Sequence, residues 1–187
     1  RTHRLAPTHG PCAAGTARTR TRTLRRGIGE LRVRADLLSV NSLTHRAKAV
    51  RFAKSLIHGY GLFAAEPVEA GDLVVEYVGE LLRGLVSDVR ELAYVRQGLG
   101  DSYMFRLNAD TVIDATRKGA VARFINHSCE PNVVARVITV DGAPKIVFYA
   151  KARIEAAEEL TYDYKFEFED EKIPCLCGAP TCRGSLN

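Results

Sequence analysis

Five short runs of β-branched and aromatic residues, separated by turn residues, define the pattern of the chain. They cover residues 73–78, 102–107, 112–114, 133–140 and 145–150. Runs of this length and composition, bounded by glycine, proline and short polar residues, are typical of β-strands. The pattern therefore predicts a domain built mainly from short strands.

Helical spacing is confined to two short segments. After Gly84, the residues Leu85, Val89, Leu92 and Ala93 fall on one face at helical spacing. A second short helix is predicted within residues 119–124. The sequence lacks the alternation of strands and helices that would indicate a parallel sheet. This absence argues against a Rossmann-type fold. The expected fold class is mostly β with short helices.

The first fifty residues differ from the rest in pattern and charge. Residues 16–23 alternate threonine with arginine or alanine and have no apolar period that could pack against a core. Residues 1–50 carry eleven Lys and Arg against two acidic residues, a net +9, and the whole chain carries +5, which leaves −4 for the remaining 137 residues. We predict a basic, disordered arm over residues 1–35, a linker over 36–50 and a folded body from residue 51. A basic arm suits a protein that works near nucleic acid, and a merely solvated arm is the alternative.

The cysteine pattern suggests a metal site. Of the five cysteines, Cys175, Cys177 and Cys182 lie within eight residues in a loop that also holds glycine and proline. No apolar run approaches a membrane span or a secretory signal, so we expect no membrane association and a reducing compartment, where grouped thiols favour a metal. Structural zinc takes four tetrahedral ligands, and Cys129 is the candidate fourth because Cys12 lies in the predicted arm. Unrelated buried cysteines are the alternative.

Three further segments concentrate side chains or backbone suited to a site. Residues 123–132, RFINHSCEPN, place two amides, an imidazole and a thiol around one turn, although a hydrogen-bonded turn would look the same. In ELTYDY, Tyr162 and Tyr164 share one face if the segment is extended, but such tyrosines are more often core residues. The glycines of HGYGLF, residues 58–63, permit close backbone approach to a ligand but lack the phosphate-binding fingerprint.

In combination, these segments resemble the SET-domain family of protein lysine methyltransferases. The family's motifs appear in its order as HGYG at 58–61, EYVGE at 76–80, RFINHSC at 123–129 and ELTYDY at 159–164. The CLCGAPTC segment followed by RGSLN resembles the post-SET zinc segment. Residues 103–106, 112–116, 162–166 and 173–178 are most similar to the trithorax-related, COMPASS-type enzymes that methylate lysine 4 of histone H3. The resemblance covers about residues 36–187.

The resemblance implies a SET-domain fold, with small β-sheets around a pseudoknot in which the NHSC and TYDY segments meet. It places the SET domain over residues 51–166 and the post-SET zinc segment over 167–187. It also implies methyl transfer from S-adenosyl-L-methionine to a histone tail lysine, expected to be lysine 4 of histone H3, by a chromatin-associated enzyme in the nucleus. The implied partners are the histone H3 N-terminal tail and the WD-repeat and SPRY-type companion subunits of a COMPASS-type complex. The basic arm would be available for nucleosome contact.

The resemblance also implies residue roles, and for the tyrosines and the cofactor-binding residues it is their main basis. Tyr164 corresponds to the catalytic tyrosine beside the sulfonium methyl and the incoming amine, while Tyr77 and Tyr103 would line the lysine channel. Tyr162 stands where the family has Phe or Tyr, and its hydroxyl would restrict the room for further methyl groups, so we expect monomethylation to be easiest. One structural zinc would be held by Cys129, Cys175, Cys177 and Cys182. The implied cofactor-binding residues are Ile57, His58, Tyr60, Tyr103, Arg123, Phe124, Asn126, His127, Tyr164 and Leu176.

Two other functions remain open at this point. One is a catalytically silent SET module that binds a histone tail or partner subunits, which S-adenosylmethionine binding would distinguish. The other is a zinc-stabilised domain that binds nucleic acid through the basic arm. Its affinity for nucleic acid would fall steeply as the salt concentration rises.

Overall fold

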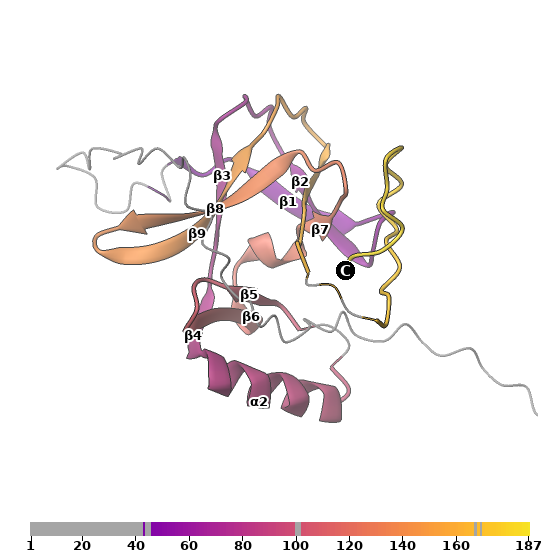
Figure 1. The fold of residues 1–187 in the computed structure, drawn as a ribbon. Helices are drawn as coiled ribbons and strands as arrows, with labels where there is room; N and C mark the ends of the chain where they lie inside the picture. The colour runs from indigo at the N-terminus through magenta and orange to yellow at the C-terminus, as the bar shows by residue number, and fades with distance from the viewer. Residues whose placement is uncertain (1–42, 44–45, 100–101, 167, 169) are drawn as a thin grey trace, which may run out of the picture.

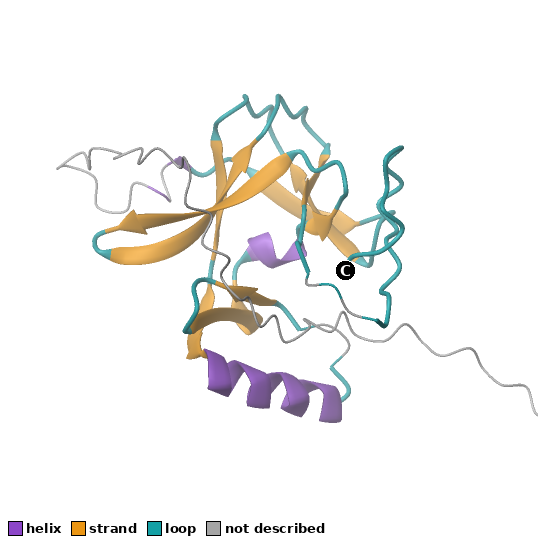
Figure 2. Cartoon of the chain, viewed as in Figure 1, coloured by secondary structure: helices purple, strands orange, loops and turns teal. Residues whose placement is uncertain are grey.

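The computed structural model describes residue 43 and residues 46–99, 102–166, 168 and 170–187. In this part of the chain, strands far outnumber helices, which confirms the predicted fold class (Figures 1 and 2). The predicted arm and most of the predicted linker lie outside the described residues. Within the described part, no helix is long and apolar enough to cross a membrane.

The strands form three small sheets. The first has the order β1 (Val50–Lys54), β2 (Tyr60–Ala64), β10 (Glu159–Tyr162) and β7 (Asn126–His127). The second has the order β3 (Leu73–Tyr77), β9 (Ala143–Ala150) and β8 (Val133–Val140). The third has the order β4 (Gly79–Arg83), β6 (Thr111–Gly119) and β5 (Met104–Arg106). All named pairs are antiparallel except β10 with β7.

Each of the five predicted runs contains a strand. The run at 102–107 gives the shorter β5, and the run at 112–114 extends to the longer β6. The β8–β9 hairpin is closed by Asp141 and Gly142, both left-handed with φ of 51° and 77°, as a two-residue hairpin turn requires. The second predicted helix is the 3-10 helix η1 (Val121–Phe124), which begins after Gly119 ends β6.

The pairing of β10 with β7 joins segments far apart in the sequence. Thr161 lies opposite Asn126 and Tyr162 opposite His127, in parallel register. Asn132 reinforces the junction, because its Oδ1 accepts a hydrogen bond from the Thr161 N–H at 2.9 Å. The NHSC and TYDY segments therefore meet, as the resemblance implied.

The core draws its side chains from all three sheets. Leu62 and Leu160 come from the first sheet, Val74 and Phe148 from the second, and Ile113 from the third. Together they form one apolar cluster, with the first four fully buried. Burial of side chains of this size is the main stabilising contribution to the domain.

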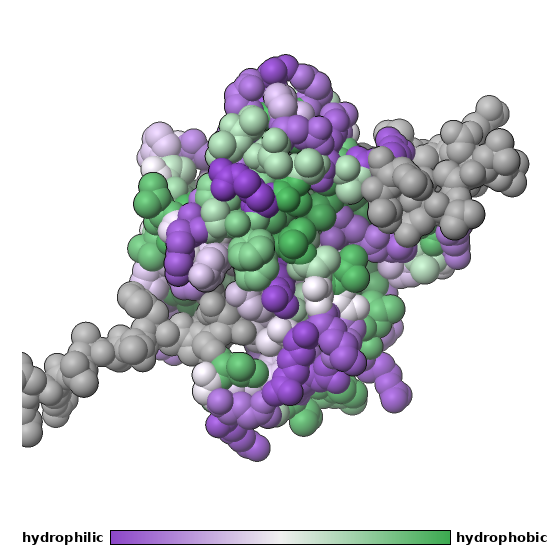
Figure 3. Space-filling model, turned by 180° about the vertical axis from the view of Figure 1, so that it is seen from behind, coloured by the Kyte–Doolittle hydropathy of each residue, from purple (hydrophilic) through white to green (hydrophobic). Residues whose placement is uncertain are grey.

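Helix α2 (Gly84–Arg96) lies at one end of the molecule, beside the third sheet (Figure 1). Its position was predicted, but its apolar face is turned outward: Leu85 is 85% exposed, Val89 69% and Leu92 58%. The residues it buries are Ser87 and Tyr94. In the view from behind, hydrophobic atoms accordingly reach the surface among polar ones at the lower end, where α2 lies (Figure 3).

Candidate active site and thiol cluster

A cavity of about 150 Å³ lies beside the junction of β7 and β10. Nine of the predicted site residues line it: His58, Tyr60, Tyr77, Tyr103, Arg123, Phe124, Asn126, Tyr162 and Tyr164. Gly59, Ser102, Met104 and Phe166 complete the wall and were not predicted, although each is adjacent in sequence to a predicted residue or within two positions of one. The fold therefore brings together residues spread over more than a hundred positions of the chain.

The inner wall of the cavity is aromatic. The Tyr162 ring is stacked on Phe105 at a centroid distance of 5.7 Å and also packs against Phe148 at 4.9 Å and Tyr164 at 4.7 Å. Burial raises the pKa of Tyr162 well above its ordinary value, and burial does the same for the pKa of Tyr77. Both phenols are therefore neutral at physiological pH.

Two tyrosine hydroxyls are held by main-chain carbonyls. The Tyr77 Oη donates to the Tyr103 carbonyl at 3.0 Å, and the Tyr164 Oη donates to the Ile125 carbonyl at 3.1 Å. A hydroxyl hydrogen committed to a carbonyl leaves the oxygen lone pairs for other contacts. The positions of both oxygens are thus set by the backbone around them.

The Asn126 side chain connects the β7–β10 junction by hydrogen bonds to residues 58–60 at the start of β2, here called the β2 loop. Its Nδ2 donates to the carbonyls of His58 at 3.2 Å and Tyr60 at 3.1 Å, and to Glu159 Oε1 at 2.8 Å. A Cβ at Gly61 would collide with the Glu159 carboxylate, so that side chain, which Asn126 and Ser55 hold, would have to shift. The close approach that the glycine pattern permitted is therefore made, at least at Gly61, by the chain's own carboxylate.

His127 is buried behind the cavity and does not line it. Its Nδ1 accepts a hydrogen bond from the Tyr164 main-chain N–H at 3.1 Å, and its Nε2 lies 3.5 Å from Cys129 Sγ. Burial lowers the pKa of His127, against the opposing effect of Asp163, and a neutral ring is what allows Nδ1 to accept. His127 thus connects the backbone of Tyr164 to the thiol cluster.

Arg123 lines the cavity and connects η1 to the main chain of β6. Its Nη1 donates to the Ala115 carbonyl at 2.9 Å, and its guanidinium lies 4.8 Å from the Phe124 ring centroid and 5.6 Å from that of Tyr103. Its Nε is buried and has no hydrogen-bond partner among the described residues. A buried N–H without a partner is costly, so this atom is a candidate contact for a ligand.

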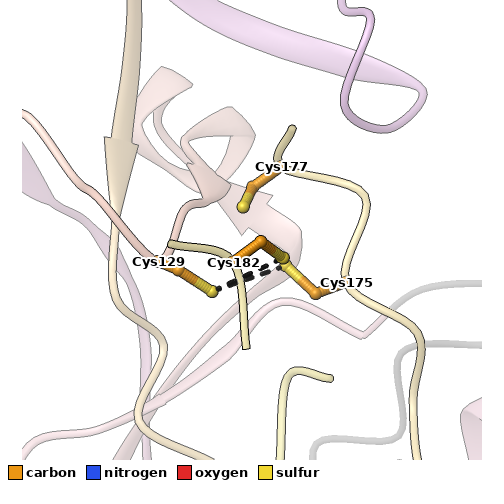
Figure 4. A group of neighbouring side chains, drawn as sticks. All are labelled: Cys129, Cys175, Cys177 and Cys182. Carbon is orange, nitrogen blue, oxygen red and sulfur yellow. Dashed lines mark hydrogen bonds between the residues drawn. The ribbon is translucent and has the colours of Figure 1, made fainter. Parts of the chain in front are cut away.

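Four thiols converge where the C-terminal loop meets the chain after β7 (Figure 4). Cys129 Sγ lies 3.8 Å from that of Cys175 and 3.9 Å from that of Cys182, and all four Sγ atoms, including Cys177, lie within 4.8 Å of one another. Tetrahedral zinc with Zn–S bonds of about 2.3 Å separates its sulfurs by about 3.8 Å. The donor set and its spacing therefore fit zinc. Cys12 lies outside the described residues.

Contacts within the cluster shift the pKa values of its thiols in opposite directions. Burial opposes ionisation of Cys177, but hydrogen bonds that include those from the Cys129 and Ala179 main chain outweigh it and lower the pKa to about 6. Burial raises the pKa of Cys175 to about 12. Zinc binds thiolates, so a thiol whose pKa is lowered favours metal binding.

The C-terminal loop makes a second contact with the site that the sequence did not suggest. Arg183 Nη2 donates to Asp163 Oδ1 at 2.9 Å, and Asp163 lies between Tyr162 and Tyr164. The only sequence signal was the position of Arg183 directly after the last thiol. Two predicted cofactor residues, Ile57 and the exposed Leu176, do not line the cavity. Their assignment, like the roles of His127 and of the nine residues that line the cavity, stays a prediction.

The family model of the SET domain matches residues 59–165. The chain belongs to the SET-domain family. A histone-lysine N-methyltransferase of Schizosaccharomyces pombe, described as H3 lysine-4 specific, is 55% identical over 172 residues, which are 91% of this chain and 19% of that protein. The histone-lysine N-methyltransferase SETD1 of Drosophila melanogaster is 53% identical over 171 residues, 91% of this chain and 10% of that protein. Human SETD1A is 56% identical over 153 residues, 82% of this chain and 9% of that protein.

This chain therefore spans less than a fifth of the length of these three relatives. The matched part of the SET domain contains most of the cavity wall and Cys129, whereas the other three thiols lie beyond it. The C-terminal cysteine cluster fits the zinc site of a post-SET segment.

Proposed function

We propose that this chain is the catalytic part of a histone-lysine N-methyltransferase that transfers a methyl group from S-adenosyl-L-methionine to lysine 4 of histone H3. The observation that carries the proposal is the tyrosine-lined cavity at the β7–β10 junction of a SET domain. The names of the similar proteins support the substrate, since they describe histone-lysine N-methyltransferases and, for the yeast protein, lysine-4 specificity.

An aromatic cavity suits the central difficulty of the reaction. The lysine amine must be neutral to attack, and with a reference pKa near 10.4 its deprotonation at pH 7 costs about 4 to 5 kcal/mol. A poorly solvated channel lowers that cost because it disfavours the ammonium form. Tyr77 and Tyr162 are neutral and buried or partly buried, so they supply such surroundings without a compensating negative charge.

Each tyrosine is assigned a role in this proposal. S-adenosyl-L-methionine supplies the methyl group as a sulfonium substituent. Tyr164, with its hydroxyl held by the Ile125 carbonyl, orients the reacting groups. Tyr77 and Tyr103 form walls of the lysine channel, and the hydroxyl of Tyr162 limits the space in which a methylated amine can turn.

The methyl donor would occupy the side of the cavity formed by the β2 loop and η1. We assign this subsite to His58, Tyr60, Arg123, Phe124 and Asn126, which all line the cavity. The fit of S-adenosyl-L-methionine rests on the hydrogen-bond donors of this subsite. Above all it rests on the buried Nε–H of Arg123, which has no partner among the described residues. A polar group of the donor would satisfy it.

We further propose that the four thiols hold one structural zinc. Four thiolate ligands leave no open position, so the metal would not act on the substrate. Its role would be to fix the C-terminal loop, which reaches the TYDY segment through Arg183 and Asp163, and to fix Cys129, which contacts His127. Zinc loss would then reduce activity through the position of Tyr164.

The proposed setting is chromatin in the nucleus, with the histone H3 N-terminal tail as substrate and WD-repeat and SPRY-type companion subunits of a COMPASS-type complex as partners. We propose the SET domain over residues 51–166, the post-SET segment over 167–187 and a basic arm over 1–35 available for the nucleosome. The outward apolar face of α2 supports the presence of a protein partner, because such surfaces are costly to leave in water.

The decisive experiment is mass spectrometry of an unmodified histone H3 peptide after incubation with the protein and labelled S-adenosyl-L-methionine, with and without the companion subunits. We expect incorporation at lysine 4, mainly as monomethyl-lysine from the protein alone. Tyr164→Phe should lower turnover for every product by about 100-fold or more. Tyr162→Phe should preserve turnover and raise the di- and trimethylated fraction.

Failure would be informative in two ways. Tight S-adenosyl-L-methionine binding by calorimetry without methylation of any lysine, even with the companion subunits, would contradict the enzyme proposal and leave a binding module. An unchanged product distribution in Tyr162→Phe would remove only the role assigned to that hydroxyl.

The zinc proposal is tested by metal analysis of the purified protein. We expect one zinc per chain, retained in Cys12→Ser and lost in Cys177→Ser. Retention of a full equivalent in Cys129→Ser would show that the site does not join the two segments.

A further inference from the structure

Asp114 is a carboxylate with no exposed surface, outside the cavity and unused by the proposed reaction. It lies on β6 and faces α2. Its Oδ2 accepts hydrogen bonds from Tyr94 Oη at 2.8 Å and Arg90 Nη1 at 3.1 Å, both on the helix. Its Oδ1 accepts from the Thr116 main-chain N–H at 2.9 Å.

These contacts keep Asp114 charged. Burial alone would raise the pKa of the carboxyl, but the hydrogen bonds from Thr116, Tyr94 and Arg90 outweigh burial and lower it. A buried carboxylate is tolerated only when its partners are fixed, and loss of one partner leaves an uncompensated charge. The inner face of α2 is therefore attached to β6 through a polar contact that tolerates little displacement.

The same stretch of β6 holds the main chain of Tyr103. The Tyr103 N–H donates to Thr116 Oγ1 at 2.9 Å, and the Tyr103 carbonyl accepts from the Ala115 N–H at 2.8 Å and from Tyr77 Oη at 3.0 Å. Strand β5, which begins next to Tyr103, is an edge of its sheet, and among the described residues it pairs with β6 alone. The position of Tyr103 thus depends on residues 115 and 116.

We infer that Asp114, held by Tyr94 on α2, is a positioning residue for the Tyr103 wall of the cavity. The inference rests on the proposed function in one respect, that Tyr103 lines a channel for the substrate lysine. The continuous set of contacts from Tyr94 through Asp114 and Thr116 to the Tyr103 N–H carries it. A displacement of α2 against the third sheet would reach the channel through these bonds.

If Asp114 had a purely structural role, loss of its carboxylate would have different effects. If the carboxylate only stabilised the fold, its loss would lower the stability of the whole domain and leave the folded site unchanged. If it positions Tyr103, the local protection of the Tyr103 amide and the affinity for the peptide change while the domain remains folded.

The test compares Tyr94→Phe and Thr116→Val, which each remove one hydroxyl of the path and keep the side-chain shape closely similar. Hydrogen–deuterium exchange is followed over residues 102–106 in the full chain. We expect exchange there to become about three- to tenfold faster in both variants, the factor that corresponds to one net hydrogen bond. Exchange over residues 102–106 in the double variant should be no faster than in Thr116→Val alone, because both substitutions interrupt the same path of hydrogen bonds.

Ser87→Ala is the matched control, since the buried Ser87 hydroxyl bonds the Gly84 carbonyl within α2 and does not contact Asp114. It should leave exchange over residues 102–106 unchanged. In the peptide methylation assay, Tyr94→Phe and Thr116→Val should raise KM for the peptide by a similar factor and change kcat by less than about twofold, as expected when binding common to ground and transition states is lost.

Unchanged exchange at residues 102–106 in folded Tyr94→Phe would overturn the inference even if Thr116→Val exchanged faster, and so would an equal effect in Ser87→Ala. If the wild-type protein methylated no peptide, the proposed function would fail while the exchange result still decided whether Asp114 positions Tyr103. If Tyr94→Phe failed to fold, Asp114→Asn would take its place in both measurements, because it keeps the side-chain shape and weakens the bonds that Asp114 accepts from Tyr94 and Thr116.

Discussion

Strand β10 lies between β2 and β7 and buries Leu160 completely, whereas helix α2 exposes Leu85 and Leu92 and buries Tyr94. The buried Leu160 of β10 packs in an apolar cluster whose members come from segments distant in sequence. Under α2, the contact with the sheet includes an ionic network of Arg90 with Glu80 and Asp114. The two regions show that apolar periodicity can mark an element correctly without marking the face it buries.

The difference has a physical cause. A core strand is stabilised by the apolar area it removes from water, so its register follows its hydrophobic residues. The attachment of α2 instead depends on the partners of one buried carboxylate, which fix geometry at little net gain in free energy. The apolar face of α2 is left available for another protein, in agreement with the proposed companion subunits.

The largest effect is expected in the β10 region. Leu160→Ala removes a fully buried side chain from the cluster it shares with Leu62 and Phe148 and should lower the free energy of unfolding by about 2 to 5 kcal/mol. Urea denaturation measures the change. A loss below about 1 kcal/mol would mean that the core can collapse around the missing atoms.

An intermediate effect is expected where the polar network is cut. Asp114→Ala leaves the Tyr94 hydroxyl and the Thr116 N–H without their acceptor and should cost about 1 to 3 kcal/mol. Asp72→Ala, which breaks the half-buried pair with Lys48, is the control and should cost less, since neither side chain of that pair is fully buried. Equal losses of unfolding free energy in the two variants would show that burial does not increase the contribution of the Asp114 hydrogen bonds to stability.

The third effect concerns pH and the same carboxylate. The pKa of Asp114 is lowered in the folded state, so the ionised carboxylate stabilises the fold. This contribution to the free energy of unfolding is fully present above the unfolded pKa of about 3.9 and is lost as the pH falls through the folded-state pKa. The stability difference between the wild type and Asp114→Asn should therefore be largest near neutral pH and shrink below about pH 4. Urea midpoints across that range measure it, and a constant difference would contradict the assignment.

The smallest effect is expected on the outer face of α2. Leu92→Ala should change the free energy of unfolding of the isolated chain by no more than about 0.5 kcal/mol, because the side chain is already largely exposed. The same substitution should weaken binding of a companion subunit if that subunit covers this face. A large loss of stability in the isolated chain would show that the face is buried in solution.

Much of the site could be predicted from sequence because its motifs are local. The thiols at 175, 177 and 182 stand together in the chain, and both Tyr162 and Tyr164 belong to one short segment. The cysteine pattern pointed to Cys129 as the long-range thiol, and the resemblance supplied the other distant residues. The structure places Cys129 among the thiols and nine predicted residues around one cavity.

Other features had no local signal. Strand β7 has two residues, too few for any periodic pattern, and exists only because β10 lies beside it. The contacts of Asn126 with the β2 loop and of Arg183 with Asp163 join positions that no spacing relates. These were not predicted because each depends on where two distant segments meet.

The sequence by itself determined that this chain forms mainly short strands, that its C-terminal cysteines are grouped, and that its tyrosines and Asn-His turn form a recognisable set. Those properties are local, since strand propensity and ligand spacing act within about ten residues. Tertiary structure alone decided which face α2 buries, that His127 lies behind the cavity, and that Asp114 connects α2 to Tyr103. Such outcomes depend on the balance between burying a polar group and satisfying its hydrogen bonds, and that balance exists only after distant segments have met.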